Sequence, residues 1–118
     1  MDAQVTALQE EKTRLLERLA EIEVEEQRQR GTFRGVPHYS VLEQAAHGLG
    51  QELSRLTQQR AAREVAAVSP AMSACPQCGR QCSLQMSHRT VSSLDGPVEV
   101  LEPAASCPAC RRAFFPSA

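Results

Sequence analysis

Apolar residues recur at helical spacing near the start of the chain. The stripe consists of Val5, Leu8, Leu15, Leu19 and Ile22, and it is interrupted by Lys12 and Glu26. Good helix formers surround these positions, so the local propensity agrees with the spacing. The pattern predicts a helix over 4–29 with a heptad face of about three repeats. Such a short face needs a partner to be stable.

A second helix is predicted after a turn that contains Gly31, Gly35 and Pro37. Ser40 and Glu43 have the spacing of a capping box at its start. Its apolar positions, which run toward Val68, are Leu42, Ala45, Ala46, Leu49, Leu53, Leu56 and Ala67. The pattern therefore predicts an antiparallel, coiled-coil-like helical hairpin over 1–68. A homodimer through the 5–22 stripe is a further expectation.

Two glycines, Gly48 and Gly50, lie inside the second predicted helix. Each costs roughly 1 kcal/mol relative to alanine, which would leave a somewhat weak or bent helix. Alternatively, the small residues let a partner helix or a nucleic-acid backbone approach closely. Ser69, Pro70 and the small residues that follow predict a linker over 69–74.

The chemistry is concentrated after the linker, where all five cysteines lie. Cys75 and Cys78 form one Cys-x-x-Cys pair, and Cys107 and Cys110 form a second. Each pair can form a tight turn that points two thiolates at one metal ion, and four thiolates make the closed tetrahedral shell of structural Zn²⁺. The spacing therefore predicts one structural zinc ion in a four-cysteine zinc ribbon over 75–118.

The segment between the two cysteine pairs predicts a β-hairpin that returns the chain to its start. Asp95-Gly96 is a strong signal for a two-residue turn. With that turn, Val91 would face Val100 and Arg89 would face Glu102, which suggests an ion pair between Arg89 and Glu102.

Other interpretations of the cysteines are less consistent with the sequence. Two disulfides need an oxidising compartment, and a thioredoxin-like pair needs a strand–helix context that the pattern lacks. An iron ion in a four-thiolate site uses the same ligands, so the sequence does not distinguish iron from zinc. Cys82 is the remaining thiol and an alternative to Cys78 as a ligand. His88 is expected on the surface, and His38 and His47 have no partner at ligand spacing.

The composition and the absence of certain motifs argue against several classes of function. The formal net charge is −1, and aromatic residues make up 3% of the chain. No apolar run is long enough for a membrane span, and the start of the sequence lacks signal-peptide character, so a cytoplasmic location is expected. The pattern contains no catalytic constellation or nucleotide-binding loop, so we expect neither enzymatic activity nor a small-molecule substrate. The arginines that suit phosphate contacts are Arg55, Arg60, Arg63, Arg80, Arg89, Arg111 and Arg112.

Four features of the sequence carry a resemblance to a known family: the two cysteine pairs, Arg89-Thr90-Val91, the hairpin around Asp95 and the Phe114-Phe115 end. Together they resemble the zinc ribbon in the N-terminal part of bacterial insertion-sequence transposases of the planctomycete-like kind. Residues 48–64 resemble the helix that precedes that ribbon. The resemblance implies DNA recognition by the ribbon. The acidic-triad nuclease domain of such transposases lies downstream, and 118 residues leave no room for it, so we expect a free-standing or truncated N-terminal piece.

The sequence thus predicts a mainly helical chain with a small β module that acts as a non-enzymatic, DNA-binding zinc ribbon. The alternative is a protein–protein adaptor, in which the heptad stripe makes a dimer and the ribbon binds another protein. Steep weakening by salt would distinguish DNA binding from an apolar interface.

Overall fold

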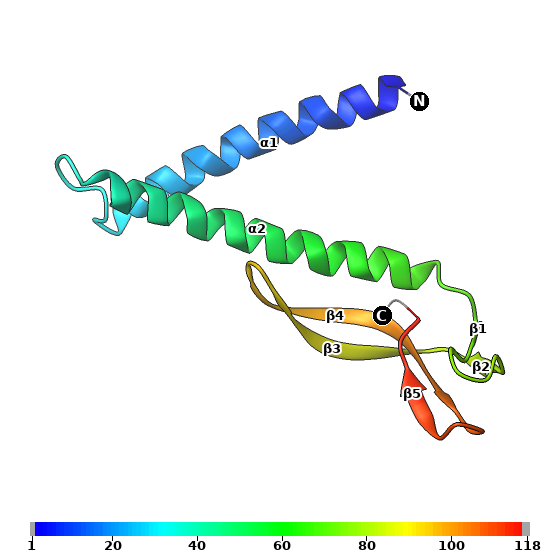
Figure 1. Ribbon diagram of the computed structural model, residues 1–118. Helices are drawn as coiled ribbons and strands as arrows, with labels where there is room; N and C mark the ends of the chain where they lie inside the picture. The colour runs from blue at the N-terminus through cyan, green and yellow to red at the C-terminus, as the bar shows by residue number, and fades with distance from the viewer. Residues whose placement is uncertain (1, 117–118) are drawn as a thin grey trace. The chain divides into compact units, whose positions relative to one another are not determined.

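The computed structural model describes residues 2–116, and these form two long helices followed by five strands (Figure 1). The helices are α1 (Asp2–Gln29) and α2 (Tyr39–Ala67). The strands are β1 (Met72–Ala74), β2 (Gln81–Ser83), β3 (Gln85–Ser93), β4 (Gly96–Cys107) and β5 (Arg112–Phe114). The prediction of two helices followed by a small antiparallel β module is therefore confirmed. None of the described helices is both long and apolar enough to cross a membrane.

Residues 1–50 and 51–118 form two separate compact units, which are described here one at a time. In the first unit, α1 has no buried residue among those described, so its predicted pairing with a second helix stays a prediction. The helix ends as expected at Gln29, and Gly31 caps it. This residue has a φ of 81°, and the Thr32 N–H reaches the Gln27 carbonyl at 2.9 Å in a Schellman-type cap.

The start of α2 differs from the predicted capping box. The backbone N–H of Ser40 donates to Nδ1 of His38 at 3.2 Å, and the Ser40 hydroxyl lies 2.8 Å from the same nitrogen. His38 therefore caps the helix, and Ser40 is already inside it. The prediction placed the cap two residues too late because a histidine ring nitrogen is an unusual acceptor at this position.

The second unit contains a two-stranded sheet, β1–β2, and a three-stranded sheet in the order β3–β4–β5, both antiparallel. Strand β1 begins inside the segment that we expected to be a linker. A small core of buried side chains joins the two sheets, with Leu84 and Phe114 packed against it. Its buried members are Cys75, Cys82, Ala105 and Cys107.

The β3–β4 hairpin forms where predicted, but its predicted register is wrong by two residues. Val91 pairs with Val98 rather than Val100, and Ser93 pairs with Gly96. The central turn residues are therefore Leu94 and Asp95. A type I′ turn at Asp95-Gly96 needs positive φ at both residues, yet Arg111 is the only described non-glycine residue with positive φ. Gly96, with a φ of 105°, instead follows the turn as a bulge residue.

A shift of two residues keeps every side chain on its predicted face, because side chains alternate along a strand. Val98 is fully buried, and Val91 and Val100 are half-buried on the same face. The predicted ion pair between Arg89 and Glu102 is present, although Arg89 lies directly opposite Val100 and reaches Glu102 diagonally.

The last turns of α2 belong to the same unit as the strands and contact the hairpin. The Ser54 hydroxyl donates to Oδ2 of Asp95 at 2.6 Å, and the Arg55 guanidinium donates to the Asp95 carbonyl at 2.8 Å. Farther along, Ala61, Ala62 and Val65 border an apolar gap of about 310 Å³ whose other walls include Val91 and Val100. These contacts hold the hairpin turn against the helix.

Candidate metal centre

Two turns of the same construction bring four cysteines together. The first joins β1 to β2, and the second joins β4 to β5. In each turn the N–H of the fourth residue after the first cysteine donates to that cysteine's carbonyl. Gly79 does so to Cys75 at 2.9 Å, and Arg111 does so to Cys107 at 2.7 Å. The predicted Cys-x-x-Cys turns are therefore both present.

Both turns need a left-handed backbone directly after the second cysteine. Gly79 has a φ of 78° and Arg111 has a φ of 55°. Glycine adopts this conformation without steric cost, whereas arginine at Arg111 is strained by about 1–2 kcal/mol. In the sequence, Gly79 is recognisable as a residue suited to the left-handed conformation, whereas nothing marks Arg111 as its equivalent in the second turn.

The Sγ atoms of Cys75, Cys78, Cys107 and Cys110 all lie within 4.8 Å of one another. Cys78 and Cys107 are 3.5 Å apart, and Cys75 and Cys110 are 3.8 Å apart, measured between sulfur atoms. In a tetrahedral ZnS₄ site with Zn–S bonds of about 2.3 Å, neighbouring sulfurs are about 3.8 Å apart. The cluster therefore has the dimensions of a four-thiolate metal site.

Backbone donors prepare the first cysteine of each turn for the thiolate form. The pKa of Cys107 is lowered to about 6, chiefly because the backbone N–H of Cys110 donates to its sulfur. Backbone N–H groups of Cys78 and Gln77 likewise lower the pKa of Cys75, and the Gln77 nitrogen lies 3.5 Å from its sulfur. Both turns thus favour the negative charge that a metal-binding thiol must carry.

The pKa of Cys110 is shifted in the opposite direction. Hydrogen bonding to Cys78, together with burial, raises the pKa of Cys110 to about 12. Without metal, Cys110 therefore keeps its proton at neutral pH, and it must release that proton when a metal ion binds.

Cys82 lies outside the four-cysteine cluster, as the predicted ligand set implied. Its side chain is buried in the small core, and its thiol lies 3.4 Å from the Arg80 carbonyl. Burial raises the pKa of Cys82, so it remains a neutral thiol. It fills core space as a small apolar residue.

The arginines predicted to contact phosphate fall into two groups. Four of them, Arg55, Arg60, Arg63 and Arg89, lie on α2 or β3, away from the cysteine turns. Arg60 pairs with Glu64 at 2.7 Å, and Arg89 pairs with Glu102 and lies 4.7 Å above the Phe115 ring. Arg55 is committed to the hairpin turn, and Arg63 borders a small groove together with Glu99.

The other three, Arg80, Arg111 and Arg112, are exposed and follow the two cysteine turns. Residues 72–86 and 104–116, which build the metal end of the unit, contain these three cations and no acidic residue. All three acidic residues of this β module, Asp95, Glu99 and Glu102, lie on the β3–β4 hairpin. Charge is therefore segregated within the module, which the sequence order alone did not reveal.

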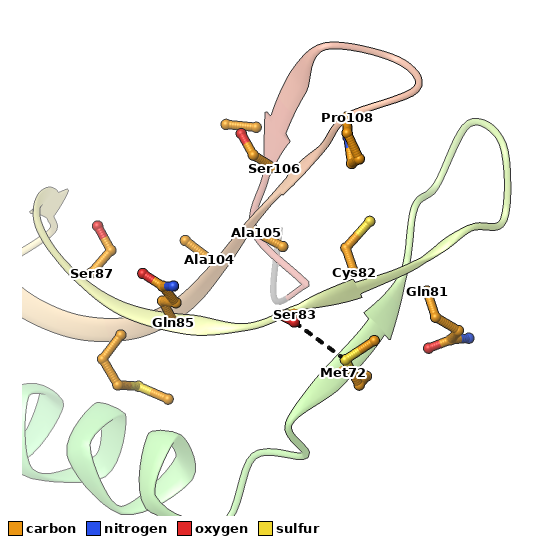
Figure 2. A pocket seen from close by; sticks show the side chains of 12 residues that line it. Met72, Gln81, Cys82, Ser83, Gln85, Ser87, Ala104, Ala105, Ser106 and Pro108 are labelled. Atoms are coloured by element: carbon orange, nitrogen blue, oxygen red, sulfur yellow. Dashed lines mark hydrogen bonds between the residues drawn. The ribbon is translucent and has the colours of Figure 1, made fainter.

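A groove of about 700 Å³ lies next to the second cysteine turn and is lined from β1, β2, β3, β4 and β5 (Figure 2). Met72 and Met86 lie on its walls, and Cys82 and Ala105 come from the small core. The polar lining consists of serine and glutamine side chains, and no charged residue lines the groove. The described lining of this groove therefore lacks the cations that a phosphate site needs.

No known family, curated protein or solved structure matches this chain.

Proposed function

We propose that residues 75–118 form a zinc ribbon around one structural Zn²⁺ and that the metal end of this module binds nucleic-acid phosphates. The observation that supports the metal is the spacing of the four sulfurs, 3.5 and 3.8 Å for two of the pairs. A four-cysteine shell leaves no open position for a substrate, so the metal has a structural role. Zinc is the proposed ion because closed thiolate tetrahedra are its preferred structural sites.

The phosphate-binding proposal rests on Arg80, Arg111 and Arg112, which are exposed at an end of the module that contains no acidic residue. A zinc ion with four thiolates carries a formal charge of −2, so these arginines leave the metal end with a net charge of only +1. The field is therefore weak, and binding must come from direct arginine–phosphate contacts. DNA as the partner, and a relation to insertion-sequence transposases, are proposals that rest on the motif resemblance.

Salt dependence tests this function on the full-length, zinc-loaded chain. Three phosphate contacts to a DNA duplex give a slope of about −2.7 for log affinity against log salt concentration. Raising the salt concentration from 50 to 200 mM then weakens binding about 40-fold. Fluorescence anisotropy with a labelled duplex measures this, and metal analysis of the same sample should find one zinc per chain.

A triple variant with Arg80, Arg111 and Arg112 replaced by glutamine should lose measurable duplex binding. The matched control replaces Arg14 and Arg28 on α1 and Arg30 directly after it, which removes the same charge elsewhere. Equal losses in both variants would mean that only overall charge matters. No affinity at 50 mM salt for the unmodified protein would overturn the phosphate-binding proposal.

The adaptor function is a second candidate, and the exposed apolar side chains of α1 favour it. Leu8 is 65% exposed and Leu15 is 56% exposed, although both belong to the heptad stripe. In this function the zinc ion keeps its structural role and the ribbon binds a protein. A salt-insensitive association of the chain, with no affinity for DNA, would support it.

A further inference from the structure

The heptad stripe of α1 is uncovered in the part of the chain that the structure describes. Val5 and Ile22 are each 47% exposed, and Leu8 and Leu15 are exposed by more than half. No residue of α1 among those described is buried. A helix of 28 residues with such a face needs a partner helix in water.

The apolar positions of α2 match only part of this stripe. If α1 and α2 packed as an antiparallel hairpin, residues at equal distances from the turn would face each other. Leu15 would then face Leu53, but Leu8 and Val5 would face Arg60 and Arg63. In addition, the second half of α2 uses Ser54, Arg55 and Gln58 to hold the β3–β4 hairpin. The N-terminal half of the α1 stripe therefore has no apolar counterpart on α2.

A parallel pair of α1 helices would place identical residues opposite each other at the core positions. Lys12 would face the partner's Lys12, and Glu26 would face the partner's Glu26. Two of the seam layers would then bring like charges together. Like charges opposed in a narrow apolar seam disfavour that arrangement.

An antiparallel pair removes both conflicts. In the register that overlaps the whole stripe, Val5 packs on the partner's Ile22, and Leu8 packs on the partner's Leu19. Lys12 meets the partner's Leu15, where its aliphatic stem can pack while the ammonium group reaches water. Glu26 lies beyond the overlap.

One flanking pair at the middle of the seam is complementary in the same register. Glu11 lies beside the partner's Arg18, and the two-fold symmetry repeats this ion pair farther along the same side of the seam. Arg18 now forms a 3.1 Å contact with Glu21, and its side chain is 67% exposed, so it is free to turn toward another chain. We propose that α1 forms an antiparallel two-stranded coiled coil with α1 of a second copy, with Glu11 paired to the partner's Arg18.

This arrangement has a consequence for the rest of the chain. The two copies of Gln29 leave the coiled coil at opposite ends, roughly 45 Å apart at a rise of about 1.5 Å per residue. Each dimer thus carries two widely spaced attachment points for its metal modules, which suits a bivalent protein. The proposal does not depend on nucleic-acid binding, because none of its residues belongs to the metal end.

Sedimentation equilibrium on the full-length chain tests both the dimer and its direction. Glu11→Arg alone and Arg18→Glu alone should each weaken dimerisation about fivefold, because each places like charges together twice. The double variant should restore the dissociation constant to within about twofold of the unmodified chain. Lys12→Leu should tighten the dimer, since it completes the apolar seam.

Arg14→Glu is the control, because this position lies on the outer face of the same helix and the charge change equals that of Arg18→Glu. Circular dichroism verifies that every variant stays helical. A parallel dimer would respond to Arg18→Glu, which would then oppose the partner's Glu23, but not to Glu11→Arg. That result, or a monomer at all concentrations, would overturn the proposal.

Discussion

The hydroxyl of Ser54 donates a 2.6 Å hydrogen bond to the carboxylate of Asp95, across 41 positions of sequence. The same aspartate offers its backbone carbonyl to Arg55 at 2.8 Å. The tip of the β3–β4 hairpin is therefore tied to the middle of α2. The second half of α2 is thus expected to unfold together with the metal-binding strands.

A double-mutant cycle on Ser54→Ala and Asp95→Asn measures this tie. Each single variant should lower the free energy of unfolding by about 1 kcal/mol, because a partly buried hydrogen bond to a carboxylate is lost or weakened. The double variant should cost less than the sum of the two. Thermal melts of the zinc-loaded chain give these values. Ser92→Ala, on the exposed side of β3, is the control, and strictly additive effects would show that Ser54 and Asp95 are uncoupled.

Removal of zinc should unfold the β module and leave most of the helical signal. The cluster of buried side chains around the cysteines is too small to hold the strands together by apolar burial alone. Structural zinc contributes an apparent 10–16 kcal/mol or so in small zinc-finger peptides. Circular dichroism before and after chelation measures the change, and a β signal that survives complete zinc removal would exclude a structural role for the metal.

Variants of single cysteines separate ligands from core residues. Cys107→Ser should abolish stoichiometric zinc binding, because it removes one of four ligands. Cys82→Ala is the matched control: it should keep one zinc per chain and lower stability by only about 1 kcal/mol through lost packing. Loss of zinc from Cys82→Ala would place that thiol in the coordination shell.

Zinc affinity should rise with pH. The thiol of Cys110, whose pKa is raised to about 12 without metal, is protonated at neutral pH and loses its proton on binding. Each such proton raises the apparent affinity about tenfold per pH unit. Where the two turns stay folded without metal, Cys107 must also release a proton below about pH 6, so the slope should increase by one. Competition with a chromophoric chelator between pH 5 and 8 measures both slopes, and a flat profile would contradict thiol ligation.

The two left-handed positions after the cysteine turns should respond oppositely to substitution. Arg111→Gly should raise the stability of the zinc-loaded chain by about 1 kcal/mol, since it removes the strain of a side chain at a φ of 55°. Gly79→Ala should lower the stability by a similar amount, although among the described residues no atom other than those of its chain neighbours lies within 4 Å of the added Cβ. Chemical denaturation quantifies both variants. If both substitutions changed the stability by the same amount in the same direction, the two cysteine turns would not share the left-handed backbone conformation.

Gly48→Ala and Gly50→Ala decide between the two interpretations of the glycines in α2. A Cβ at either position meets nothing within 4 Å among the described residues. Each substitution should therefore raise helix stability by about 1 kcal/mol in thermal melts. Destabilisation, or loss of a binding activity, would instead indicate that another molecule approaches the helix closely at these glycines.

Local patterns determined much of what the sequence could predict. Heptad spacing located α1, and paired Cys-x-x-Cys motifs identified the four clustered cysteines, because both signals act over a few residues. The helix cap at His38 and the hairpin register were predicted incorrectly. Each depended on a choice between local conformations of similar energy: a ring nitrogen against a hydroxyl as the cap, and a turn centred on Leu94-Asp95 against a type I′ turn at Asp95-Gly96.

By itself, the sequence determined which residues can form helices, which thiols can share a metal, and which faces of the hairpin are apolar. These properties follow from side-chain chemistry and periodicity. Only the tertiary structure decided that Ser54 and Arg55 hold Asp95, that Arg89 reaches Glu102 diagonally, and that Arg80, Arg111 and Arg112 gather at an end free of acidic residues. These relationships join segments far apart along the chain, and their geometry depends on the register of strands and the direction of turns. A one-dimensional pattern does not contain that geometry.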